Sequence, residues 1–277
     1  MTPAEAEASP PLEGPSGHAP PTGPDAPLAY HNSKFIDSEA ARPLRILAEY
    51  LRPMDAFSKQ RVHDTIVFFG SARLAEDGPL GRYYADAREL ARLVTIWSQG
   101  LPSPTHRFLV VTGGGGGIME AANRGAADAG GRTIGLNIGL PHEQRPNAYI
   151  TKGLLFEFHY FFMRKLWFAH LARAMVVFPG GFGTLDEFFE ILTLSQTRKL
   201  DRRLPILLYG TDYWKSLLNF EMLVQHGMID AGDLDLFHFV DSPTQAFDLL
   251  QQRLQVSMEP VTPAFAKSKN PSDKPRT

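Results

Sequence analysis

The sequence predicts an α/β fold in which one parallel sheet carries helices on both faces within a single domain. Two observations lead to this prediction. Short β-rich runs alternate with longer helical stretches, which is the pattern of parallel strands joined by helical crossovers. The β-rich runs are apolar throughout, as expected of strands that are covered on both sides. Helices are therefore expected above and below the sheet.

The predicted elements follow one another in a regular order. The expected strands comprise residues 65–69, 108–112, 133–137, 174–178 and 205–209. The expected helices comprise residues 83–97, 118–129, 157–172 and 185–199. Residues 98–107 contain two prolines and one glycine, so we expect a loop between the first helix and the second strand.

The two ends of the chain differ in composition from its middle. Residues 1–33 contain eight of the 22 prolines and few large apolar side chains. Residues 258–277 are rich in proline, lysine and serine. Segments of this kind bury too little apolar surface to fold, so both are predicted to be disordered tails. The folded domain is then expected to span residues 34–257.

Composition excludes several classes of function. The chain has no cysteine, which rules out disulfides, thiolate catalysis and cysteine-ligated zinc and is compatible with a cytoplasmic location. The net charge of −2 provides no basic field for nucleic acid. No apolar run is long enough to span a membrane, and the first basic residue is Lys34, so no secretion signal is expected.

The most informative segment is the glycine-rich turn of residues 179–187. It follows the apolar strand 174–178 and precedes a helix that is expected to open at Thr184. Glycines let backbone N–H groups converge on an anion, and a helix N-terminus favours negative charge, so a phosphate held here would lie near Glu187. The same residues also match a capping box, in which Glu187 would bond back to the Thr184 N–H. Catalysis and capping both remain open from this segment alone.

A second glycine run, residues 113–117, follows the strand 108–112 and precedes the helix 118–129. It does not match the dinucleotide motif Gly-x-Gly-x-x-Gly, because Ile118 occupies the last glycine position. The chain also lacks a Walker-type Gly-Lys-Ser/Thr and a Gly-x-Ser-x-Gly nucleophile elbow. No histidine pair has the spacing of a zinc site, so no metal is expected. A phosphate-binding or tight-turn role is the remaining interpretation.

The expected helix 157–172 is apolar nearly all round, which is typical of a buried helix or of a subunit interface. It carries the adjacent cations Arg164 and Lys165, which lie about 100° apart and cannot share one narrow polar stripe. Each side chain could reach out to water. Alternatively, Arg164 is held inward against an anion or against the carboxylate of Glu187.

Taken together, these segments resemble the Lonely Guy (LOG) family, whose members are often labelled "lysine decarboxylase". The resemblance rests on Thr112 to Gly125, on Arg164-Lys165 and on the turn from Pro179 to Glu187, and it covers residues 64–255. It implies a Rossmann-like domain that forms at least a homodimer, with its site near the dimer interface. At the two positions where plant-type members carry Met-His, this chain has Phe161-Phe162, and its glycine run looks like that of the longer bacterial branch.

The resemblance also implies roles for particular residues. Arg164 matches the catalytic arginine of the family and Glu187 its catalytic glutamate. Substrate or phosphate contacts are implied for Gly70, Ser71, Gly114, Gly115, Gly116, Lys165, Gly180, Gly181, Gly183 and Thr184. No metal or cofactor is implied.

The expected function is hydrolysis of the N-glycosidic bond of a nucleoside 5′-monophosphate, either AMP-like or a cytokinin riboside monophosphate. The products would be the free base and ribose 5-phosphate, and the partner would be a small nucleotide, not nucleic acid or a membrane. The alternative is a non-catalytic nucleotide or molybdenum-cofactor carrier on the same scaffold. The presence of both Arg164 and Glu187 favours the enzyme.

Overall fold

The computed structural model describes residues 28–103, 105–139, 145–200 and 204–255. The chain divides into two compact units, residues 1–45 and 46–277. In the first, α1 (Ser33–Ile36) is capped by the Asn32 side chain, which accepts a hydrogen bond from the Phe35 N–H. The second predicted tail, residues 258–277, lies entirely outside the described residues, as do residues 1–27 of the first, whereas the 3₁₀ turn η1 (Ala29–His31) falls within the first.

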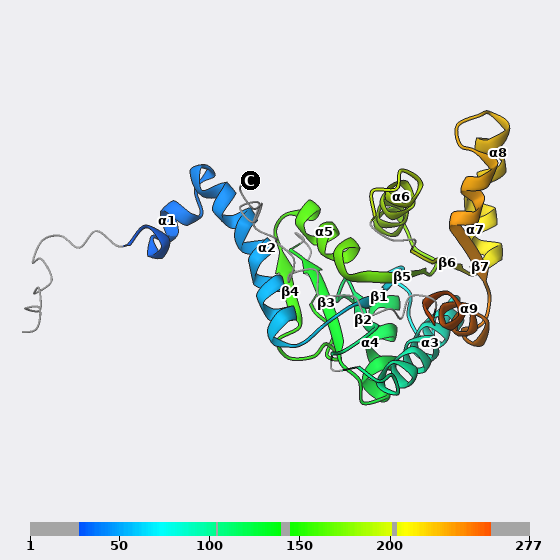
Figure 1. The fold of residues 1–277 in the computed structure, drawn as a ribbon, viewed down its shortest axis with the longest axis horizontal. Helices are drawn as coiled ribbons and strands as arrows, with labels where there is room; N and C mark the ends of the chain where they lie inside the picture. Colours follow the sequence, from blue (N-terminus) through cyan, green and yellow to red (C-terminus); the bar gives the residue numbers. More distant parts are fainter. Residues whose placement is uncertain (1–27, 104, 140–144, 201–203, 256–277) are drawn as a thin grey trace, which may run out of the picture. The chain divides into compact units, whose positions relative to one another are not determined.

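The second unit is built on a seven-stranded sheet in which every strand pair is parallel (Figure 1). The strand order is β4-β3-β2-β1-β5-β6-β7. The strands are β1 (Thr65–Phe69), β2 (Leu109–Thr112), β3 (Thr133–Ile138), β4 (Leu155–Phe158), β5 (Ala172–Val177), β6 (Ile206–Tyr209) and β7 (Phe237–Val240). The fold is therefore the predicted Rossmann-like α/β architecture.

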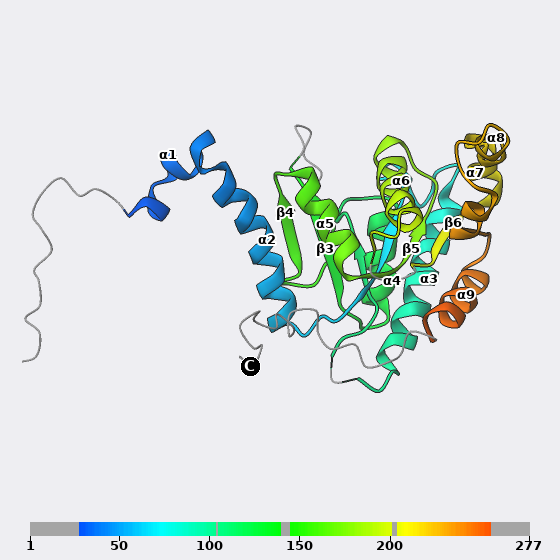
Figure 2. The same ribbon diagram turned by 45° about the horizontal axis from the view of Figure 1, so that its top comes forward.

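Helices cover both faces of this sheet (Figure 2). Beyond η1 and α1, the helical segments are η2 (Glu39–Ala41), α2 (Arg42–Lys59), α3 (Gly81–Gln99), α4 (Ile118–Asp128), α5 (Phe161–Leu171), α6 (Phe182–Gln196), α7 (Thr211–Leu217), α8 (Phe220–Gln225), η3 (Ala231–Leu236) and α9 (Pro243–Gln255). The core on one face draws side chains from α5 and α6, and the core on the other from α3, α4 and α9.

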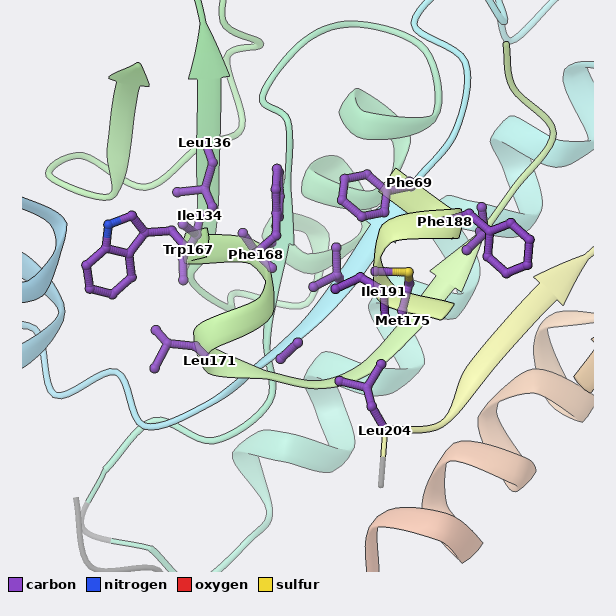
Figure 3. Packing of buried hydrophobic residues seen from close by; sticks show 14 of the residues in the cluster. Phe69, Ile134, Leu136, Trp167, Phe168, Leu171, Met175, Phe188, Ile191 and Leu204 are labelled. Atoms are coloured by element: carbon purple, nitrogen blue, oxygen red, sulfur yellow. The ribbon is translucent and has the colours of Figure 1, made fainter. Parts of the chain in front are cut away.

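Alternation along each strand supplies the two cores. Val67 and Phe69 of β1 point to the face of α5 and α6, whereas Ile66 and Phe68 point to the face of α3 and α4. Figure 3 shows the first core, where Phe168 of α5 packs edge-to-face on Phe69 with their ring centroids 4.7 Å apart. This packing fixes α5 against the sheet and thereby positions the cations that the helix carries.

The predicted strands and most of the predicted helices are confirmed, with two corrections. The predicted helix 157–172 is wrong at its start, because Leu155–Phe158 forms the edge strand β4 and α5 begins at Phe161. Buried Phe156 and Phe158 alternate there with exposed neighbours, which is the period of a strand. Helix α6 begins at Phe182, two residues before the expected opening at Thr184.

Candidate active site at the switch point of the sheet

The chain reverses its direction of travel across the sheet between β1 and β5. Strands β2, β3 and β4 extend from β1 on one side, and β6 and β7 extend from β5 on the other. In open parallel sheets, ligands bind beyond the carboxyl ends of the strands at such a switch point. A ligand site is therefore expected at the loops that follow β1 and β5.

The structure brings three glycine-bearing loops together at this point. The Ser71 N–H donates to the Pro179 carbonyl at 3.0 Å, which joins the loop after β1 to the loop after β5. The Ile118 N–H donates to the Ser71 carbonyl at 3.1 Å, which adds the loop after β2. Gly70 packs against the side chain of the same Ile118. The loops that follow β1, β2 and β5 thus meet at the switch point.

Two glycines in these loops have a steric requirement. Gly117 has a φ of +62°, and a side chain there would collide with the Ser71 carbonyl. A side chain at Gly180 would collide with the Thr184 hydroxyl and approach the Ser71 N–H. Glycine allows this close contact because it has no Cβ. The loops could not approach as closely with alanine at either position.

The first turn of α6 carries no side-chain cap. Its N-cap residue is Gly181, which accepts the first helical hydrogen bond from the Leu185 N–H at 3.0 Å. Thr184 lies inside the first turn, not at its cap, so the capping-box interpretation of Thr184 and Glu187 is wrong. The N–H groups at the start of α6 lack intrahelical partners, which is the normal condition of a helix end. These donors remain available to a ligand.

Glu187 forms a buried ion pair with Arg164. One guanidinium nitrogen of Arg164 lies 2.6 Å from Oε1 of Glu187, and their side chains are 13% and 5% exposed. The guanidinium carbon lies 5.5 and 5.6 Å from the ring centroids of Phe161 and Phe168. Of the two placements considered for Arg164, the inward one is observed. In the described part of the chain its Nε has no hydrogen-bond partner.

The pKa of Glu187 is set by burial and by Arg164, which act in opposite directions. Burial raises its pKa above the ordinary glutamate value, although the charge and hydrogen bond of Arg164 act in the opposite direction. A raised pKa on a buried carboxyl beside one specific cation is a common mark of functional sites. It favours a chemical role for Glu187 over a purely structural one.

Lys165 also faces α6, which the sequence did not lead us to expect. Its Nζ lies 2.8 Å from carboxylate oxygens of both Asp186 and Glu190. Burial alone would lower the pKa of Lys165, but these two hydrogen bonds outweigh it and raise the pKa overall. Arg164 and Lys165 therefore both bridge α5 to α6, Arg164 through Glu187 and Lys165 through Asp186 and Glu190. In the described residues, the ion pairs of Lys165 are with α6 and not with the glycine turns.

The loop after β2 is organised by polar side chains that sequence reasoning missed. The Gly114 N–H donates to the Thr112 hydroxyl at 2.9 Å, so this N–H is already occupied. The Thr112 hydroxyl donates to the side chain of buried Asn123 at 2.7 Å, and the Asn147 amide donates to the same Asn123 oxygen at 2.9 Å. Thr112 and Asn123 lie in the segment from Thr112 to Gly125 that resembles the LOG family. Asn147 lies outside that segment, and nothing in the sequence links it to this loop.

No metal centre emerges from the described residues, where no group of three or more histidine or carboxylate side chains could hold an ion. None of the helices in the same residues is long and apolar enough to cross a bilayer.

The family model described as "Possible lysine decarboxylase" matches residues 119–250. A "Cytokinin riboside 5'-monophosphate phosphoribohydrolase" from Rhodococcoides fascians is 33% identical over 167 residues, covering 53% of this chain and 81% of that protein. A "Probable cytokinin riboside 5'-monophosphate phosphoribohydrolase LOG4" from Oryza sativa subsp. japonica is 30% identical over 138 residues. That match covers 48% of this chain and 58% of the rice protein, which is less than two thirds of its length.

Among solved structures, the molybdenum cofactor binding protein from Rippkaea orientalis has a TM-score of 0.47 and 17% identity. The match covers 69% of this chain and 98% of that one. A likeness this weak bears on neither activity nor ligand.

Fold and site together define a Rossmann-like α/β protein with an acid–arginine pair at its switch point. The extent and identity of the Rhodococcoides fascians match then identify the chain as a member of the LOG, or lysine decarboxylase-like, family.

Proposed function

We propose that this protein hydrolyses the N-glycosidic bond of nucleoside 5′-monophosphates. The observation that carries the proposal is the buried Arg164–Glu187 pair at the uncapped start of α6. It places an ionisable carboxyl one turn from unpaired helix N–H groups. The names of the family relatives, which describe hydrolysis of cytokinin riboside 5′-monophosphates, support the same reaction.

The 5′-phosphate would bind at the first turn of α6. Helix N-termini attract phosphate because their N–H groups are unpaired and their dipole favours negative charge. A side chain built at Gly181 or Gly183 would meet nothing within 4 Å, so this side of the turn is open. We assign the phosphate to the N–H groups of Gly181, Gly183 and Thr184, and this binding would fix the position of the ribose.

Glu187 would act at the reacting carbon. Cleavage of an N-glycosidic bond passes through an oxocarbenium-like state, which a nearby carboxylate stabilises. Water adds to C1′ of the ribose, the C1′–N bond breaks, and its electron pair leaves with the base. One proton of the attacking water goes to Glu187. The departing base takes up one proton, and Glu187 releases the proton that it received, which returns it to its ionised form. Arg164 would hold Glu187 in place, and its charge and hydrogen bond lower the pKa of the buried carboxyl group, which favours the ionised form.

A panel of nucleoside 5′-monophosphates tests this proposal. Wild-type protein is incubated with AMP, GMP, CMP, UMP and a cytokinin riboside monophosphate, and free base and ribose 5-phosphate are quantified. We expect at least one to be cleaved, and adenosine to be cleaved far more slowly than AMP, because phosphate binding fixes the reacting centre. Comparable rates on adenosine and AMP would contradict the phosphate assignment. Binding without release of base would instead favour a carrier.

We also propose that the protein forms at least a homodimer through α5. Phe161 and Phe162 are 51% and 50% exposed, and Leu166 is exposed beside them. Such a group of exposed apolar side chains is typical of an interaction surface. Sedimentation velocity should show a dimer at micromolar concentration, and Phe162→Asp should dissociate it. A wild-type monomer under these conditions would contradict the proposal.

A further inference from the structure

Carbonyl groups of both glycine turns are held by side chains from other parts of the chain. The Tyr213 hydroxyl donates to the Gly180 carbonyl at 2.7 Å. The Asn147 amide donates to the Gly115 carbonyl at 3.0 Å and also lies 3.2 Å from the Gly114 carbonyl. Neither side chain belongs to the Arg164–Glu187 pair, and neither is needed to explain how the strands and helices form.

Each of these carbonyls shares a rigid unit with an N–H group. A trans peptide is planar, so its C=O and the N–H of the next residue point in opposite directions. Holding the Gly180 carbonyl on one side therefore turns the Gly181 N–H to the other. By the same reasoning, the Asn147 side chain fixes the direction of the Gly116 N–H through the Gly115 carbonyl. The Gly114 carbonyl, which shares a peptide unit with the Gly115 N–H, also accepts from the Asn147 backbone N–H at 2.8 Å.

The N–H groups fixed in this way are free donors. In the described residues, the N–H groups of Gly181, Gly115 and Gly116 donate to no protein acceptor. The neighbouring Gly114 N–H differs, because the Thr112 hydroxyl accepts from it. Tyr213 and Asn147 thus hold peptide units whose N–H groups have no acceptor within the described protein.

Both side chains are themselves held firmly. The ring of Tyr213, on α7, packs edge-to-face against Trp214 with their centroids 5.3 Å apart, and Trp214 is fully buried. The Asn147 amide donates to buried Asn123, and its own oxygen accepts from the Tyr149 N–H at 3.2 Å. Because both are anchored, they can hold the turns in one orientation before a ligand arrives.

We propose that Tyr213 and Asn147 are positioning residues that aim backbone N–H groups of the two glycine turns at the phosphate of a sugar phosphate monoester. This inference rests on the proposed function for the identity of the ligand. Preorganised donors bind an anion more tightly than donors that must first reorient, so the two side chains contribute affinity without touching the ligand.

Two substitutions test the proposal. Tyr213→Phe removes the hydroxyl and keeps the ring on Trp214, and Asn147→Asp replaces the donating amide with an oxygen that repels the two carbonyls. We expect each to weaken ribose 5-phosphate binding, measured by calorimetry, about tenfold, as loss of one orienting hydrogen bond implies. The KM for AMP should rise by a similar factor with kcat little changed, because the lost interaction concerns binding and not the reacting bond.

The matched control is Tyr50→Phe, which removes the hydroxyl of another tyrosine that packs on a tryptophan, Trp167. It should change neither the Kd nor the KM. If the role of Tyr213 is purely structural, Tyr213→Phe should lower the Tm and leave the Kd for ribose 5-phosphate unchanged. That result would overturn the positioning role and leave the proposed hydrolysis untouched. A wild-type protein that binds ribose 5-phosphate more tightly than Tyr213→Phe, yet cleaves no monophosphate, would support the inference and reject the proposed hydrolysis. A wild-type protein that binds no ribose 5-phosphate would overturn both.

Discussion

Two buried carboxyl groups of the described residues, Asp64 and Glu187, are paired with arginines at opposite ends of the central strands, and they differ in how fully the carboxyl group is paired. Asp64 precedes β1 at the amino end of the sheet and is 2% exposed on its side chain. It accepts hydrogen bonds from Nε of Arg107 at 2.7 Å and from the Phe108 N–H at 2.6 Å. Arg173 and His63 lie 3.4 and 3.1 Å from the same carboxylate.

Glu187, beyond the carboxyl end of β5, accepts from Arg164 alone in the described part of the chain. Burial acts to raise the pKa of both carboxyls, but the outcome is opposite. At Asp64 the hydrogen bonds of His63 and Phe108 and the charge of Arg107 win, and its pKa falls below the ordinary value. At Glu187 burial wins, and its pKa rises.

We propose that this difference separates a structural carboxylate, Asp64, from a reactive one, Glu187. A fully paired carboxylate has little capacity left for a substrate, and its charge stabilises the fold. A carboxyl group with one partner can still accept hydrogen bonds from a substrate, and it can take up or release a proton during the reaction. Active sites commonly lower stability in this way. Exchange of each carboxylate for its amide should therefore affect different properties.

The largest expected effect is the loss of activity in Glu187→Gln. Because a catalytic carboxylate contributes at least about 100-fold, turnover of AMP should fall by that factor or more. Ribose 5-phosphate should still bind. The Tm should change less than in Asp64→Asn, because burial outweighs Arg164 in setting the pKa of Glu187 and the ionised carboxylate therefore adds no net stability. Near-normal turnover would show that the comparison is wrong and that Glu187 is a structural residue.

Asp64→Asn should act on stability instead. Breaking a buried ion pair by removing one charge costs about 3 kcal/mol, which urea unfolding at neutral pH can measure. The folded-state pKa of Asp64 lies below its unfolded value, so its stabilisation is full above the unfolded pKa and is lost as pH falls through the folded one. The difference from wild type should therefore shrink in acid. The kcat of the folded fraction should be unchanged, and a large fall in kcat would contradict the separation.

The smallest expected effect is a shift in the pH profile of AMP cleavage. If ionised Glu187 is required, activity should fall as pH drops through its raised pKa, so the acid limb should lie above the ordinary glutamate value. The Arg164 charge lowers this pKa, so the residual activity of Arg164→Gln should show an acid limb at higher pH than wild type. An acid limb that does not move would indicate that another group controls the profile.

Local sequence patterns predicted much of the fold and part of the site. Apolar runs such as residues 65–69 predicted buried strands because a strand covered on both faces of the sheet buries every one of its side chains. The same reasoning failed at β4, where the aromatic residues that follow drew the predicted helix back over an edge strand. The pairing of Arg164 with Glu187 was one of two alternatives, and the observed burial decided between them.

What the sequence by itself determined was the alternation of strands and helices from β1 to β6, apart from β4, and the glycine turns that end three of the strands. Backbone conformation depends on neighbouring residues, and glycine positions are visible in the chain. Only the tertiary structure decided where α6 begins and brought Lys165 toward the carboxylates of that helix. It also brought Tyr213 to Gly180 and Asn147 to Gly115. These contacts join residues that are far apart in the sequence, and they form because parallel strands bring the ends of distant segments to the same edge of the sheet.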